Sequence, residues 1–141
     1  MREIHAQKTG SDYSRLPKEV FYMYNRYLIT GSTGFLGRAI IEKLVRRNFR
    51  VDALVLHNDP YAALLPGEVH TVIGDVCEDD SLERFFADAD NTTCVIHCAG
   101  IISVASRSGS KLYQVNIGGT CKVVRQCLER HIGKMIYVSS V

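Results

Sequence analysis

The stretch YLITGSTGFLGRAI (residues 27–40) places three glycines within seven positions, directly after an apolar run and directly before residues with helical spacing. This pattern indicates that something lies too close to the backbone for side chains. Gly31 and Gly34 predict a tight turn whose backbone can touch a diphosphate, because the N–H groups and dipole of a helix N-terminus favour negative charge. Gly37 is expected to let the helix pack closely on the sheet. A glycine-rich connector without a ligand is the alternative interpretation.

The chain from residue 26 onward alternates between strand and helix patterns. Apolar runs predict strands at 26–30, 50–56, 69–74, 92–100 and 134–141, and helical spacing predicts helices at 35–48, 80–89 and 112–131. Asp80 or Ser81 is the expected N-cap of the second helix. This alternation predicts an α/β fold with a parallel sheet covered on both faces. We expect the doubly wound strand order 3-2-1-4-5, which binds ligands where the order reverses.

The first 25 residues differ from this pattern. Residues 1–25 are polar and weakly periodic, and we interpret them as an N-terminal extension that can be flexible. Met23 is an alternative start to Met1. Residues 26–141 form one predicted domain, which stops at its fifth strand. We therefore expect a domain that is incomplete at its C-terminus.

The composition argues against several classes of protein. The chain has 141 residues, of which 46% are hydrophobic, and its 17 basic and 15 acidic residues give a net charge of +2. No partnership with nucleic acid or an anionic membrane is predicted from such a balance. No apolar stretch approaches the length of a membrane span, and the first residues lack the apolar h-region typical of a signal peptide, so we expect neither. The five cysteines lack metal-binding spacing, so we expect no metal site and a cytoplasmic protein.

Five segments together resemble one known family. TGSTGFLG (30–37) matches the TGxxGxxG pattern of extended short-chain dehydrogenases/reductases, which include sugar-nucleotide epimerases and dehydratases, dihydroflavonol reductases and 3β-hydroxysteroid dehydrogenases. The segments GDVCEDDSL (74–82), VIHCAG (95–100), VNIGGT (115–120) and MIYVSSV (135–141) resemble later parts of the same family, in the same order. The resemblance implies that residues 26–141 form a Rossmann-type domain that binds NAD or NADP.

The resemblance also implies roles for particular residues. Asp75 would contact the adenine with Val76 beside it, although an Asp in this place can simply cap the next turn. Ser140 would be the catalytic serine, with Ser139 next in line, because strand alternation lets one of the two face the cofactor. The predicted cofactor-binding residues are Gly31, Thr33, Gly34, Phe35, Leu36, Gly37, His57, Asp75, Val76, Ala99 and Gly100.

Other polar residues and glycines in the matched segments are interpreted as structural. His97 lies within an apolar strand and is expected to be a packed histidine, neither a ligand nor a base. Asn116, inside a predicted helix, is expected to hold neighbouring segments together by hydrogen bonds. Gly118 and Gly119 are costly inside a helix, and close packing of the helix on the sheet is the simplest explanation.

The choice between NAD and NADP is not decided by the sequence. An acid at the end of the second strand binds the ribose diol of NAD, and an Arg there pairs with the extra phosphate of NADP. Val55 and Leu56 occupy these two places. His57 and the residues after it remain candidates from the loop, whereas Asp52 comes too early in the strand.

The family's chemistry is hydride transfer at a carbinol or carbonyl carbon, with a Tyr and a Lys four residues later as the acid/base pair. No Tyr of this chain has a Lys at that distance. We therefore expect the cofactor-binding part of an oxidoreductase, epimerase or dehydratase that is inactive alone. A regulatory module that binds NAD(P) without catalysis is the alternative. The expected partner is a small-molecule substrate, and the full-length protein can be a homodimer.

The loop 101–111 is the one local segment that can border a substrate. It contains Arg107 and Lys111, which suit an acidic or phosphorylated substrate or simply interact with solvent.

Overall fold

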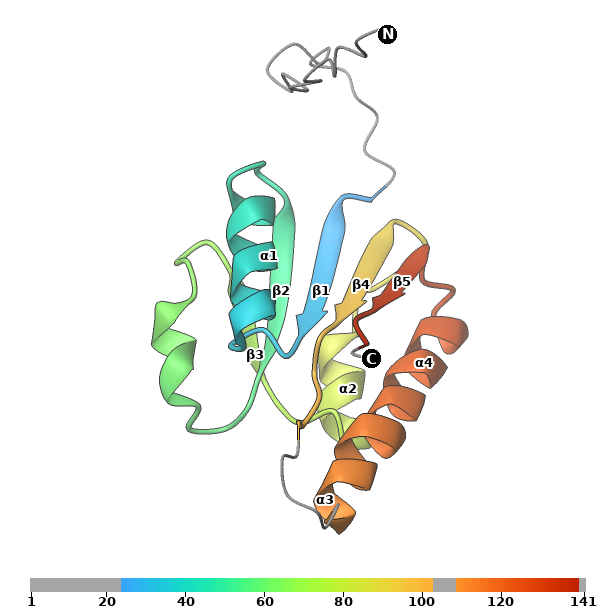
Figure 1. Cartoon of the computed structure of the whole chain (residues 1–141). Helices are drawn as coiled ribbons and strands as arrows, with labels where there is room; N and C mark the ends of the chain where they lie inside the picture. The colour runs from blue at the N-terminus through green and yellow to red at the C-terminus, as the bar shows by residue number, and fades with distance from the viewer. Residues whose placement is uncertain (1–23, 103–108, 140–141) are drawn as a thin grey trace, which may run out of the picture.

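The sheet of this protein has the predicted topology. A computed structural model describes residues 24–102 and 109–139, and the strands in this part of the chain form a five-stranded sheet (Figure 1). The strand order is β3-β2-β1-β4-β5, and every neighbouring pair is parallel. The doubly wound order 3-2-1-4-5 is therefore confirmed. The strands are β1 (Arg26–Thr30), β2 (Arg50–Val55), β3 (His70–Ile73), β4 (Thr93–His97) and β5 (Lys134–Tyr137).

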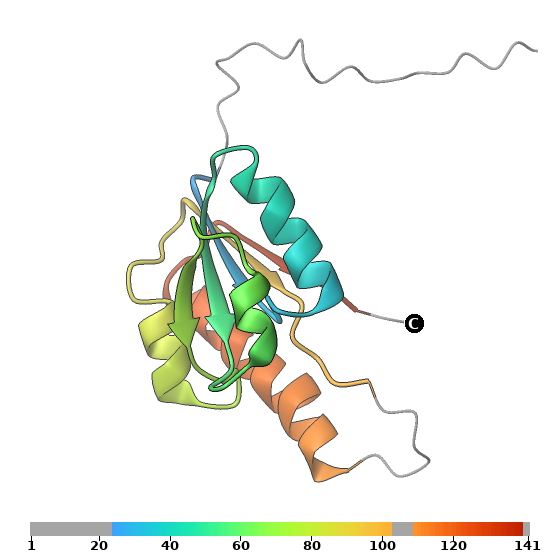
Figure 2. The same ribbon diagram turned by 90° about the vertical axis from the view of Figure 1, so that its left-hand side faces the viewer.

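The helices cover both faces of this sheet. Figures 1 and 2 show α1 on one face and α2 with α4 on the other. In the part of the chain that the structure describes, no helix combines the length and the apolar character needed to cross a membrane. The helical elements are α1 (Phe35–Val45), the 3-10 helix η2 (Pro60–Leu64), α2 (Asp79–Phe85), α3 (Ser110–Tyr113), the π-helix η3 (Gln114–Gly119) and α4 (Thr120–Glu129).

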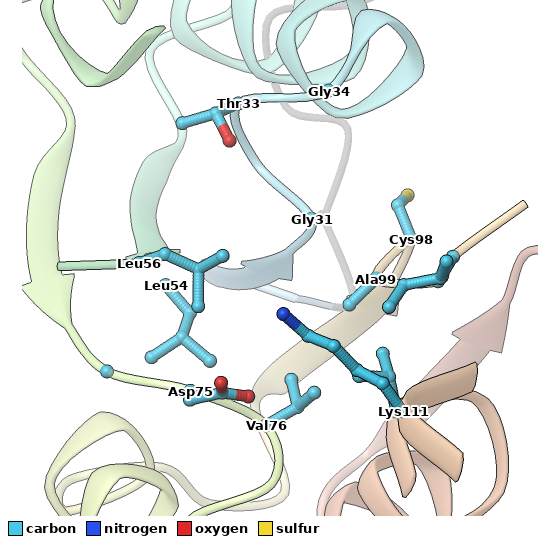
Figure 3. A pocket seen from close by; sticks show the side chains of 14 residues that line it. Gly31, Thr33, Gly34, Leu54, Leu56, Asp75, Val76, Cys98, Ala99 and Lys111 are labelled. Carbon is cyan, nitrogen blue, oxygen red and sulfur yellow. The ribbon is translucent and has the colours of Figure 1, made fainter. Parts of the chain in front are cut away.

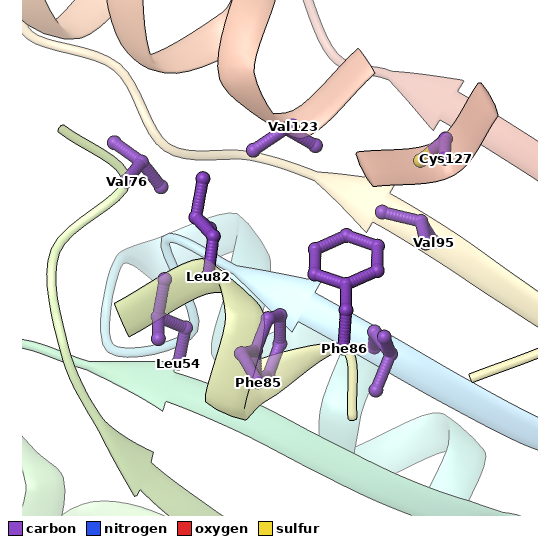
Figure 4. Packing of buried hydrophobic residues seen from close by; sticks show 9 residues of the cluster. Leu54, Val76, Leu82, Phe85, Phe86, Val95, Val123 and Cys127 are labelled. Atoms are coloured by element: carbon purple, nitrogen blue, oxygen red, sulfur yellow. The ribbon is translucent and has the colours of Figure 1, made fainter. Parts of the chain in front are cut away.

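Two hydrophobic layers fill the space between the helices and the sheet. Successive residues of a strand point to opposite faces, so the apolar runs of β1, β2 and β4 supply both layers. The layer under α1 contains Ile29, Ile41 and Ile96. The layer under α2 and α4 is shown in Figure 4 and includes Phe85 and Phe86. Their rings meet edge to face at 5.5 Å and anchor α2 to the sheet.

The segment predicted as one helix over residues 112–131 is in fact three elements. It begins as α3, continues as η3 and becomes a regular α-helix at Thr120. A Cβ at Gly119 would lie 2.7 Å from Cγ2 of Val76, whereas a Cβ at Gly118 would meet nothing within 4 Å. The expectation of close packing is therefore right for Gly119, which packs on the segment after β3, and wrong for Gly118.

Two local details differ from the sequence prediction. The N-cap of α2 is Glu78, neither Asp80 nor Ser81, and Ser81 instead donates a hydrogen bond of 2.7 Å to the Glu78 carboxylate. Asp79 and Asp80 lie in the first turn of α2, where a negative charge interacts favourably with the helix dipole. The loop after β2 contains η2, which starts at Pro60. Proline is pre-organised for a first helical position, so this turn had a signal in the sequence.

The end of the predicted extension contacts the domain. The Tyr24 hydroxyl donates to the Gly133 carbonyl at 3.3 Å. Asn25 is bound to Thr92 both by its backbone N–H and by its side-chain oxygen, each at 3.1 Å. Residues 1–23 lie outside the described residues, so the extension itself stays a prediction.

We predict opposite effects of alanine at the two neighbouring glycines of η3. Gly119→Ala should lower the free energy of unfolding by about 1–3 kcal/mol, because the methyl group overlaps Val76. Gly118→Ala should raise it by about 0.5–1 kcal/mol, because the site is open and alanine restricts the unfolded chain. Urea denaturation of both variants measures this, and equal effects would contradict the packing assigned to Gly119.

Candidate cofactor site

A cavity of about 350 Å³ lies at the carboxyl ends of the central strands (Figure 3). It is bounded by the glycine turn after β1, the ends of β2 and β3, the segment after β4, and α3 with the start of η3. Seven lining residues are among those predicted to bind the cofactor: Gly31, Thr33, Gly34, Asp75, Val76, Ala99 and Gly100. The other seven are Leu54, Leu56, Gly74, Cys98, Ile101, Lys111 and Val115.

Two of the three glycines are required by the protein itself. Gly31 has φ +65°, and a Cβ there would lie 2.6 Å from the backbone N of Ala99. A Cβ at Gly37 would lie 2.2 Å from the carbonyl oxygen of Gly31. Gly37 thus packs against the turn that leaves β1. The turn therefore packs directly on the end of β4, and the start of α1 packs directly on the turn.

Gly34 is the glycine of the three that the protein needs least for its own packing. Its backbone is extended, with φ −69° and ψ 165°, and a Cβ would meet only the Gly31 carbonyl at 3.3 Å. Gly34 is also the N-cap of α1, where no side chain caps the helix and the first turn contains no acidic residue. The first N–H groups of α1 are therefore available to an anion at the edge of the cavity. This arrangement fits a diphosphate.

The loop after β2 does not decide between NAD and NADP. Val55 is buried and Leu56 lines the cavity. The Asp59 carboxylate is bound within the protein, because it accepts 2.7 Å and 2.9 Å hydrogen bonds from the Thr33 hydroxyl and the Tyr61 N–H. His57 borders a second cavity next to the first. Asp52 is indeed too early in β2: it is fully buried and forms an ion pair with Arg26.

Asp75 lies on the side of the cavity opposite the glycine turn (Figure 3). Its Oδ1 accepts a 2.9 Å hydrogen bond from the Cys77 N–H, so the turn-capping interpretation is confirmed. The carboxylate also interacts with the Cys77 thiol, whose pKa is raised by burial and by Asp75, but two carboxylate oxygens still leave acceptor sites free. The carboxylate can therefore cap the turn and still accept a hydrogen bond from a ligand. Contact with an adenine stays a prediction.

His97 is a packed histidine, as predicted. It is fully buried, and its two ring nitrogens hydrogen-bond the hydroxyls of Thr30 at 2.6 Å and Thr120 at 2.9 Å. Its ring stacks on Tyr137 with centroids 5.6 Å apart. Burial lowers the pKa of His97 to about 4. A neutral imidazole thus links β1, β4 and α4 just below the cavity.

Asn116 ties η3 to the segment after β4. Its Oδ1 accepts from the Ile101 N–H at 2.8 Å, and its Nδ2 donates to the Ile101 carbonyl at 2.9 Å. This confirms the expectation that Asn116 holds segments together. The pair fixes the wall of the cavity that Gly100, Ile101 and Val115 form.

Phe35, Leu36 and Ser139, which were also predicted to belong to the site, do not line the cavity. Phe35 and Leu36, in the first turn of α1, are 87% and 45% exposed and do not line it. Ser139 is exposed just after β5. Ser140 lies outside the described residues. The roles of these residues in binding or catalysis stay predictions.

The cavity also includes residues that the sequence analysis did not assign to the cofactor. Lys111 and Val115 lie four positions apart, which places them on one face of a helix. That spacing is visible in the sequence, but the face that meets the cavity is set by the Asn116 contact. Burial raises the pKa of the Cys98 thiol, so this lining cysteine stays protonated near neutral pH.

A parallel sheet of this order, with a glycine turn at its switch point, defines a Rossmann-type nucleotide-binding domain of the extended short-chain dehydrogenase/reductase class. The chain belongs to the 3-beta hydroxysteroid dehydrogenase/isomerase family, whose model matches residues 28–141. A nicotinamide dinucleotide, NAD or NADP, agrees with this family, and the residues after β2 leave the choice open.

Two curated relatives show how much of such a protein the chain spans. It is 32% identical over 122 residues to human 3 beta-hydroxysteroid dehydrogenase type 7, covering 82% of this chain and 32% of that protein. It is 30% identical over 131 residues to mouse short-chain dehydrogenase/reductase family 42E member 1, covering 92% of this chain and 31% of that protein. The chain thus spans about a third of the length of these relatives.

Solved structures of epimerases share the fold. The UDP-glucose 4-epimerase of Thermus thermophilus, solved in complex with NAD, has 25% identity and a TM-score of 0.72. That match covers 82% of this chain and 37% of the epimerase. The epimerase Mth375 of Methanothermobacter thermautotrophicus has 24% identity and a TM-score of 0.74, with coverages of 84% and 36%, and shows the fold alone.

We predict that His97 makes the domain sensitive to acid. Its pKa of about 4 in the folded protein lies below the ordinary 6.5, so the unfolded chain binds the proton at higher pH. The free energy of unfolding should therefore fall by about 3 kcal/mol as the pH drops from about 6.5 to about 4, and stay level above that range.

His97→Gln should flatten this dependence, because glutamine can bond both threonines without titrating. His57→Gln, at an exposed position, is the control and should keep the slope of the unchanged protein. Urea denaturation across this pH range measures all three. A His97→Gln slope equal to that of the unchanged protein would rule out His97 as the cause.

Proposed function

We propose that this chain binds the cofactor of an NAD(P)-dependent oxidoreductase, epimerase or dehydratase whose substrate is a small molecule with a carbinol or carbonyl carbon. The observation that carries this proposal is the position of the cavity. It lies between the uncapped N-terminus of α1 and Asp75. This is the point between β1 and β4 at which the strand order reverses. Both ends of a dinucleotide's adenosine diphosphate would meet suitable groups there.

The residues of this chain bind and orient rather than react. The N–H groups of the first turn of α1, from Phe35 onward, would hold the diphosphate, and the Asp75 carboxylate would accept a hydrogen bond from the adenine. The apolar side chains of Leu54, Leu56 and Val76 would exclude water from the adenosine. When bound, the nicotinamide ring of such a cofactor accepts or donates a hydride.

The carboxyl end of β4 would guide the nicotinamide half of the cofactor toward the place where the substrate binds. Ala99 and Gly100 line the cavity there, and the Ala99 N–H donates to the Thr30 hydroxyl at 3.4 Å. Ser139 follows β5 at the same edge of the sheet. Ser139 and Ser140 remain the candidates for hydrogen-bonding the substrate oxygen, which would stabilise the charge that develops on it.

The test of this proposal is a valine at Gly34. Gly34→Val should abolish NAD(P) binding, because the branched side chain fills the edge of the cavity at the start of α1. The variant should stay folded, because its φ and ψ suit an L-residue, with a melting temperature lowered by about a few degrees because valine is a poorer N-cap and its Cβ lies close to the Gly31 carbonyl. Calorimetric titration with NADH and with NADPH measures the loss and also decides which cofactor is preferred.

Gly67→Val is the matched control, because Gly67 is exposed in the loop before β3 and a Cβ there meets nothing within 4 Å. It should bind as the unchanged protein does. The proposal fails if Gly34→Val is folded and still binds either cofactor with unchanged affinity.

A further inference from the structure

One cation reaches the cavity from the side opposite the glycine turn. Lys111 belongs to α3 and lines the cavity. Figure 3 shows its side chain extending into the space between Gly31, Asp75 and Ala99, with the ammonium group at the tip. An exposed lysine more often points into solvent, where its hydration is best. The direction of this side chain therefore suggests a role in the cavity.

The backbone that carries Lys111 is held in place independently of any ligand. Val115, four residues later, lines the same cavity, so the two share one helical face. Asn116 is bound to both backbone groups of Ile101 at 2.8 Å and 2.9 Å. This two-point contact fixes the start of η3 beside the segment after β4. Lys111 therefore lies about one helical turn before Asn116, the residue that this contact fixes.

Lys111 has no charged partner among the residues that the structure describes. Asp75 and Lys111 are the two residues with a full charge among those that line it. No ion pair joins them, nor does the Lys111 ammonium bond any other residue in the described parts of the chain. Lys122 differs, because Asp79 accepts a hydrogen bond from its ammonium. The cavity therefore presents a carboxylate and an uncompensated ammonium.

We propose that Lys111 binds the diphosphate of the dinucleotide from the side opposite the glycine turn. This inference rests on the proposed function. A diphosphate brings two negative charges, whereas the start of α1 offers neutral N–H donors and Asp75 adds a further negative charge. Lys111 supplies the missing positive charge, and an ammonium is well suited to phosphate as a point charge.

The test uses ADP-ribose as the probe, because its diphosphate is its one anionic group. Lys111→Met should raise the Kd for ADP-ribose about tenfold, the loss expected for one charge-assisted hydrogen bond. Lys111→Arg should restore most of the affinity, since arginine also pairs with phosphate. Lys43→Met is the matched control: it removes an exposed lysine from the last turn of α1, at the end away from the cavity. Its affinity should be unchanged.

Two readouts separate a charge effect from a structural one. Calorimetric titration at low and at high ionic strength should show a weaker salt dependence for Lys111→Met than for the unchanged protein. The melting temperatures of all variants should agree. The inference is wrong if Lys111→Met binds as tightly as Lys43→Met, or if its loss comes with a lower melting temperature that Lys111→Arg does not restore.

The same experiment distinguishes this inference from the function on which it rests. Unchanged binding by Lys111→Met together with lost binding by Gly34→Val would overturn the role of Lys111 and leave the cofactor site in place. Absence of ADP-ribose binding by the unchanged protein would overturn both.

Discussion

The arrangement of this domain depends on the contact between the backbone of Gly31 and the end of β4. With φ +65°, Gly31 turns the chain so closely under Cys98 and Ala99 that a Cβ would lie about 2.6 Å from their backbone atoms. Its carbonyl then accepts the Gly34 N–H at 3.2 Å and lies under Gly37. One turn therefore fixes both the junction of β1 with β4 and the starting point of α1.

The other sides of the cavity are held by contacts that need no ligand. The Thr33 hydroxyl is bound to Asp59, Asp75 caps its own turn, and Asn116 holds Ile101. The contacts of Thr33 and Asn116 join segments that are adjacent at the carboxyl ends of the strands, and the Asp75 contact fixes a single turn. The cavity is therefore pre-organised, which reduces the entropy that binding a dinucleotide would cost. The uncapped start of α1, the Asp75 carboxylate and the ammonium of Lys111 are polar groups that remain for a ligand.

The sheet, its strand order and half of the residues that line the cavity could be predicted from the sequence, because buried parallel strands and a glycine turn leave strong local patterns. Gly31 and Gly34 were identified in this way, whereas Asp75 was identified through the resemblance of GDVCEDDSL (74–82) to a family segment. The π-helix η3 could not be predicted from the sequence. It includes Gly119, whose close packing is on Val76, a residue 43 positions away in the chain. Lys111 could be noticed but not placed, since the Asn116 contact that orients its helix is a tertiary one.

The central claim is that the start of α1 and the Asp75 turn bind the two ends of one adenosine diphosphate. Amide chemical-shift mapping by NMR during a titration with ADP-ribose tests it most directly. The account predicts that the largest shifts fall on Gly34 and Phe35, on Asp75 and Val76, and on Ala99 across the cavity. Shifts confined to other surfaces, or to one of these two sides of the cavity alone, would contradict it.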